Sequence, residues 1–230
     1  MALAAVFFDV GETLVDETEL MGGWADSVGV PRLTFFAAIG AVLARRTELA
    51  SPNPDRPVLR EVLRMVRPDL DVADAVRRRG GAQVFSVEHL YPDALPCMLA
   101  VRELGYRVGI AANQPALADA VVRSSGLPFE WLLISDVEGV SKPDPAFFDR
   151  ILEISGLPAS SIAYVGDRVD NDVVPAVRAG MAAVHVRRGP WGVVQAGWPE
   201  ADLATLRLGS LAELPGRMHE LAAMRRRQAG

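Results

Sequence analysis

Short apolar runs alternate with segments of helical periodicity over most of the chain. Apolar runs of four to eight residues are typical of buried strands. Strands that alternate with helices predict a parallel sheet covered by helices on both faces. We therefore expect an α/β fold whose strands are Ala4–Asp9, Tyr106–Ala112, Trp131–Ser135, Ile162–Gly166 and Ala182–Val186.

Residues 15–89 have a different pattern, because apolar positions there repeat at helical spacing and no strand is convincing. Phe35, Ile39 and Leu43 fall on one helical face, and Asp71 is a good N-cap. Turn residues at 51–55 predict a loop, and the glycines at 80–81 should end a helix.

This helical block interrupts the α/β pattern after its first strand. The expected division is a core domain of residues 1–14 and 90–230 and a helical domain of residues 15–89. A helix from Asp144 carries Pro145 at its first turn, and another begins near Asn171 and ends at Gly180. The last residues, 214–230, predict a surface helix.

Composition narrows the class of protein. The chain has 230 residues, of which 50% are hydrophobic, and its net charge is −5. No apolar run approaches the ~20 residues of a membrane helix, and the acidic balance does not favour nucleic acid. One cysteine, Cys97, excludes an internal disulfide, so we expect a cytoplasmic protein with a buried thiol.

Five polar residues follow the ends of predicted strands or lie in nearby loops. They are Asp9, Asn113, Lys142, Asp167 and Asp172, and Lys142 is the only lysine in the chain. Singly, each has a structural interpretation as a cap, turn or surface residue. Ligands of open α/β sheets bind beyond the carboxyl ends of the strands. Clustered carboxylates there favour Mg²⁺, which would bind phosphate oxygens as well.

The motifs resemble those of the haloacid dehalogenase-like hydrolase superfamily over essentially the whole chain. The first motif is Asp9-Val10-Gly11-Glu12-Thr13, and the second is Ala111-Ala112-Asn113. Lys142-Pro143-Asp144-Pro145 and the segment 166–172, which begins Gly-Asp and ends in Asp, are the third and fourth. The resemblance implies a Rossmann-like three-layer core with a parallel sheet, and an inserted α-helical cap.

The resemblance also implies roles for individual residues. Asp9 would be the nucleophile that forms an aspartyl-phosphate, and Lys142 would orient it and the phosphate. Thr13 and Asn113 would contact the substrate. The implied metal ligands are Asp9, the backbone carbonyl of Gly11, Asp167 and Asp172.

Two positions depart from the superfamily pattern. Gly11 replaces an aspartate that protonates the leaving group and later activates water, and Ala112 replaces a hydroxyl residue. General acid–base catalysis is worth about 10²–10⁴ in rate. Glu12 is the neighbouring candidate for the acid–base role, and its longer side chain either reaches the site or points away from it.

The resulting hypothesis is a Mg²⁺-dependent phosphatase of a small phosphorylated metabolite, without nucleic acid or membrane partners, as a monomer or homodimer. One alternative is a catalytically impaired member that binds a phosphorylated ligand or a protein partner. Another is a 2-haloacid dehalogenase, although the acidic residue Asp167 favours phosphoryl chemistry.

Overall fold

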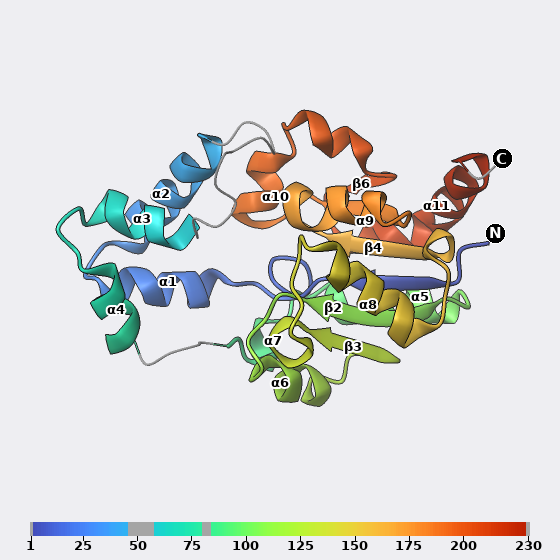
Figure 1. Cartoon of the computed structure of the whole chain (residues 1–230), viewed down its shortest axis with the longest axis horizontal. Coiled ribbons are helices and arrows are strands. Elements are labelled where there is room, and N and C mark those ends of the chain that lie inside the picture. Colours follow the sequence, from blue (N-terminus) through green and yellow to red (C-terminus); the bar gives the residue numbers. More distant parts are fainter. Residues whose placement is uncertain (1, 46–57, 80–83, 229–230) are drawn as a thin grey trace.

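The computed structural model describes residues 2–45, 58–79 and 84–228. Its centre is one parallel sheet of six strands in the order β3-β2-β1-β4-β5-β6 (Figure 1). The predicted α/β class with a parallel sheet is confirmed. The strands are β1 Ala5–Phe8, β2 Arg107–Ala112, β3 Trp131–Ile134, β4 Ile162–Gly166, β5 Ala182–Val186 and β6 Leu206–Leu208.

Strand β1 lies in the middle of the sheet, and its side chains alternate between two apolar layers. Val6 and Phe8 belong to one buried cluster, whereas Ala5 and Phe7 belong to another. This alternation is the period of two that a strand imposes. A strand buried on both faces explains why the sequence there is continuously apolar.

Helices cover the two faces of the sheet and form the outer layers of the three-layer core. The face with Val6 and Phe8 packs against residues of α5 Ala94–Glu103, α6 Ala118–Ser124 and α11 Leu214–Gln228. The face with Ala5 and Phe7 packs against α8 Pro145–Ser155 and α9 Val174–Arg178. In the described ranges, no single helix is long and apolar enough to cross a membrane, although Thr18–Ser27 (α1) and Arg32–Ala44 (α2) pass that test together as a bent pair.

The helical block after β1 forms a hydrophobic cluster of its own. Within the described residues, the block consists of four helices that lie together at one end of the molecule (Figure 1). They are α1 Thr18–Ser27, α2 Arg32–Ala44, α3 Val58–Val66 and α4 Val72–Arg78. Asp71 caps α4 by accepting a hydrogen bond from Asp74 N. The loop expected at 51–55 and the helix end at 80–81 lie outside the described residues, and the domain boundaries at 14 and 89 stay a prediction.

Several elements differ from the expectation. Strand β6 was not predicted, because it has three residues and one of them is the exposed Arg207. The region before α9 is a π-helix, Val169–Val173, rather than the start of a regular helix at Asn171. Ser135 begins α7, Ser135–Glu138, instead of ending β3, and α10, Gly189–Gln195, is a helix that was not predicted.

Candidate active site

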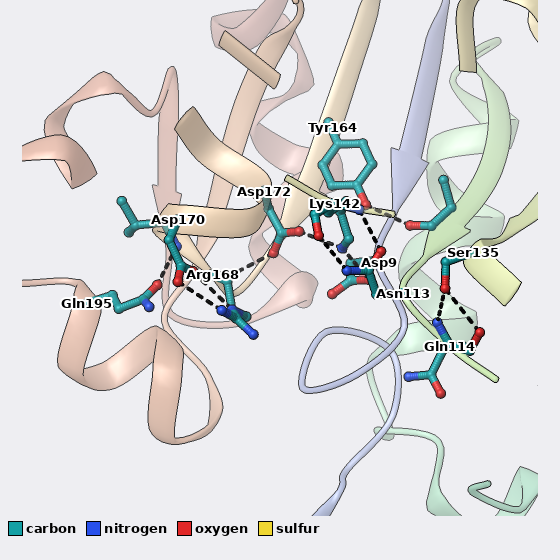
Figure 2. A network of polar contacts seen from close by, with 12 residues as sticks. Asp9, Asn113, Gln114, Ser135, Lys142, Tyr164, Arg168, Asp170, Asp172 and Gln195 are labelled. Carbon is teal, nitrogen blue, oxygen red and sulfur yellow. Dashed lines mark hydrogen bonds and ion pairs between the residues drawn. The ribbon is translucent and has the colours of Figure 1, made fainter. Parts of the chain in front are cut away.

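Three side chains from distant parts of the chain meet at the carboxyl ends of β1 and β4. Lys142 Nζ lies 2.7 Å from Asp9 Oδ1 and 2.6 Å from Asp172 Oδ1 (Figure 2). The side chains of Lys142 and Asp172 are at most 2% exposed, and that of Asp9 is 10% exposed. A buried ammonium between two carboxylates is a charge arrangement that solvent does not screen.

Lys142 is positioned through its own backbone. Its N–H donates to Asn113 Oδ1 at 2.7 Å, and its carbonyl accepts from Asn113 Nδ2 at 2.8 Å. The amide of Asn113 therefore joins the end of β2 to the loop that carries the lysine. The peptide bond between Lys142 and Pro143 is cis, and Asp144 caps α8 through Ala146 N.

The π-helix after β4 positions Asp172. Arg168 N donates to Asp172 Oδ2 at 2.9 Å, so this carboxylate is bonded on one side by a backbone amide and on the other by Lys142. The Arg168 side chain pairs with Asp170 instead. Gln195 Oε1 accepts from Val169 N at 2.6 Å, which ties the turn to α10.

Asp167, directly after β4, completes an acidic cluster with Asp9 and Asp172. One carboxylate oxygen of each lies within 4.8 Å of the others, and all three residues are buried. Asp167 Oδ2 is buried and has no hydrogen-bond partner among the described residues. Hard cations such as Mg²⁺ take oxygen ligands of this kind. The donor set and the unpartnered buried oxygen therefore fit a divalent cation.

Burial and charge shift the protonation equilibria of this cluster. Burial raises the pKa of Asp9 even though Lys142 opposes the shift, and burial with repulsion from Asp172 and Asp9 raises the pKa of Asp167. Burial would lower the pKa of Lys142, but Asp172 and Asp9 raise it well above its usual value. Lys142 therefore stays charged and can compensate only part of the negative charge.

The turn after Asp9 holds the remaining residues of the first motif. Glu12 has a φ of +50° and is buried, and its carboxylate accepts hydrogen bonds from Tyr91 Oη at 2.7 Å and Glu17 N at 2.9 Å. Burial raises the pKa of Glu12. Thr13 is fully buried, and its Oγ1 has no partner among the described residues.

A cleft of about 190 Å³ opens beside this cluster. Its walls include Asp9, Gly11, Asn113, Lys142 and Asp167, together with Glu12. The structure thus places most of the sequence-predicted residues at the cleft. Thr13 and Asp172 do not line it, although Asp172 belongs to the acidic cluster and contacts Lys142. The roles assigned to these residues stay predictions.

Sequence reasoning missed Glu17, which also lines the cleft. Glu17 precedes α1 and is half-buried. Burial, with repulsion from Glu12 and Asp9, raises its pKa to about 7. The number of residues between Asp9 and Glu17 does not predict that Glu17 lines the cleft. Its place there follows only from the folded conformation of the turn after Asp9.

The family of the chain follows from comparison with known proteins. A family model described as haloacid dehalogenase-like hydrolase matches residues 3–180. The chain belongs to this family of hydrolases, as its motifs suggested. Among solved structures, a dehalogenase complex shares the fold with a TM-score of 0.66 at 20% identity, over 93% of this chain and 96% of that one.

Two relatives are phosphatases by name. A glyceraldehyde 3-phosphate phosphatase from Methanopyrus kandleri is 35% identical over 105 residues, or 44% of this chain and 45% of that protein. This match thus spans less than half the length of the relative. A phosphoserine phosphatase from Thermus thermophilus is 31% identical over 200 residues, or 83% of this chain and 76% of that protein.

Proposed function

We propose that the protein hydrolyses small phosphate monoesters with Mg²⁺, through a covalent intermediate on Asp9. The observation that carries this proposal is the contact of Asp9 with the buried Lys142, beside the unpartnered carboxylate of Asp167. The phosphatase names of two relatives support the choice of reaction. Carboxylates are established nucleophiles for phosphoryl groups.

The chain's own residues supply orientation and charge. Asp9 Oδ would attack phosphorus, displacing the ester oxygen and forming an acyl phosphate. Lys142 fixes the direction of the Asp9 carboxylate and presents a positive charge to the phosphoryl oxygens. Asn113 holds the lysine backbone in place and, at the wall of the cleft, is our candidate for contact with the phosphate.

Asp9, the carbonyl of Gly11, Asp167 and Asp172 would hold Mg²⁺. The bound cation would neutralise charge on the phosphoryl oxygens. Without it, three clustered carboxylates face a single ammonium. A dianionic substrate would then be repelled from the cleft.

The test is phosphate release with Mg²⁺ from a panel of p-nitrophenyl phosphate, glyceraldehyde 3-phosphate, phosphoserine and phosphoglycolate. We expect turnover of at least one ester by the wild type and loss of turnover in Asp9→Asn. If the wild-type protein releases phosphate from none of these esters, the proposal is contradicted.

A second candidate is a member that binds a phosphorylated ligand or a partner without turnover. It is motivated by Gly11 and Ala112, which lack the carboxyl and hydroxyl groups of the superfamily motifs. Robust wild-type turnover would exclude it. A 2-haloacid dehalogenase is the third candidate, since solved dehalogenases share the fold. Halide release from 2-haloacids in the presence of EDTA would support it.

A further inference from the structure

The carboxylate of Glu17 lies where a side chain at position 11 would begin. A Cβ atom built on Gly11 would be 2.6 Å from Glu17 Oε1, 2.9 Å from its Cδ and 3.3 Å from its Oε2. Separations below 3.0 Å essentially never occur for real Cβ atoms, so a side chain at position 11 would require the Glu17 carboxylate, the far end of a flexible side chain, to move away. The space beside Asp9 is therefore occupied by a carboxylate that comes from another position in the chain.

The surroundings keep the Glu17 carboxylate in the cleft without neutralising it. The backbone N–H of Glu17 donates to Glu12 Oε1, and this hydrogen bond ties the start of α1 to the turn after Asp9. Gln114 Nε2 approaches Glu17 Oε1 at 3.4 Å, a long hydrogen bond. Within the described part of the chain, no arginine, lysine or histidine forms an ion pair with Glu17.

Glu12 differs from Glu17 in this respect. Both of its carboxylate oxygens already accept hydrogen bonds, one from Tyr91 Oη and one from Glu17 N. Glu12 therefore acts on the cleft mainly by holding the turn. Glu17 is the carboxylate that lines the cleft with a single, long hydrogen bond.

We infer that Glu17 is a catalytic residue that supplies the carboxyl group missing at Gly11. This inference rests on the proposed function. In the first step, Asp9 Oδ bonds to phosphorus, the bond from phosphorus to the ester oxygen breaks, and that oxygen takes the proton from Glu17. In the second step, water bonds to phosphorus, its proton passes to Glu17, and the bond from phosphorus to Asp9 breaks. The products are an alcohol, phosphate and the original enzyme.

The leaving group distinguishes this role from a structural one. An alkyl ester needs a proton on its leaving oxygen, whereas p-nitrophenolate leaves without one. With the fastest alkyl phosphate of the panel, Glu17→Gln should lower kcat by about 10²–10⁴. With p-nitrophenyl phosphate, the same variant should release a burst of one p-nitrophenolate per chain and then turn over slowly, because the phosphorylated Asp9 lacks a base for its hydrolysis.

Three further variants make the test decisive. Glu19→Gln, an exposed acid of α1, is the matched control and should behave as wild type. Gly11→Asp combined with Glu17→Ala should recover at least tenfold in kcat over Glu17→Ala alone, because the new side chain then has room. Glu12→Gln tests the competing residue and should show no burst.

The inference is overturned if Glu17→Gln turns over the alkyl ester at the wild-type rate. It is also overturned if the variant loses activity equally on the alkyl ester and on p-nitrophenyl phosphate and shows no burst. A burst in Glu12→Gln alone would also overturn it and would favour Glu12. These outcomes leave the phosphatase proposal intact. That proposal fails separately, when the wild type releases no phosphate from any ester.

Discussion

Lys142 Nζ contacts Asp9 Oδ1 at 2.7 Å inside the protein, although Asp9 follows the first strand and Lys142 lies in the distant loop between α7 and α8. The contact exists because β1 and β2 are neighbours and the Lys142 loop is tied to the end of β2 through Asn113. The same ammonium also contacts Asp172, so one cation stabilises two buried carboxylates. The Lys142 ammonium therefore contributes both to folding stability and to the arrangement of the active site.

Removal of Lys142 should destabilise the fold. Lys142→Met leaves Asp9 and Asp172 buried without their cation, which typically costs about 3–5 kcal/mol. Chemical denaturation at neutral pH in EDTA measures this loss. The difference from wild type should shrink as the pH is lowered, because burial raises the pKa of Asp9 and its protonation removes part of the uncompensated charge. Arg150→Met, which breaks a part-buried pair with Glu138 and a second pair with Glu153, should cost less.

Mg²⁺ should stabilise the wild type by binding only the folded protein. At a Mg²⁺ concentration of 100 times its Kd, the free energy of unfolding should rise by about 2.7 kcal/mol. This corresponds to about 5–10 °C in Tm for a domain of this size. Asp167→Asn should lose most of this increase but keep the Tm measured in EDTA, because Asp167 Oδ2 has no partner to lose. Asp149→Asn, on the exposed side of α8, should respond to Mg²⁺ as wild type does. An unchanged response in Asp167→Asn would remove Asp167 from the metal site.

Gly166 should not tolerate a side chain. A Cβ there would lie 2.2 Å from Asp172 Oδ2, and Asp172 cannot move without losing Lys142 and Arg168 N. We expect Gly166→Ala to cost about 1–3 kcal/mol and to reduce activity. Gly40→Ala is the control, because nothing lies within 4 Å of a Cβ in that helix. It should be stabilising by about 0.5–1 kcal/mol, and equal unfolding midpoints for the two variants would contradict the prediction.

Cys97 should be unreactive in the native protein. The thiol is buried in α5, and burial with the charge of Asp93 raises its pKa to about 12. At pH 8 the reactive thiolate is therefore scarce and shielded. Ellman's reagent should detect one thiol per chain in denaturant and almost none within minutes in buffer. Rapid reaction of the native thiol would contradict this burial.

The sequence predicts the site where its residues follow strand ends. Asp9 and Asp167 were predicted because parallel strands bring their carboxyl ends to one edge of the sheet. Strand β6 was not predicted because three residues are too few to show a hydrophobic pattern. Helix α10 was not predicted because its glycines and proline are typical of loops. Glu17 could not be predicted, since its approach to Gly11 depends on a turn in which Glu12 adopts a positive φ.

The central claim is a covalent phosphoryl intermediate on Asp9, and trapping it is the most direct test. Wild-type protein is mixed with Mg²⁺ and the best ester of the panel, quenched in acid during turnover and measured by intact and peptide mass spectrometry. We predict one added phosphoryl group per chain, located on Asp9 and absent in Asp9→Asn. Turnover without any labelled protein, or with the label on another residue, would contradict the claim.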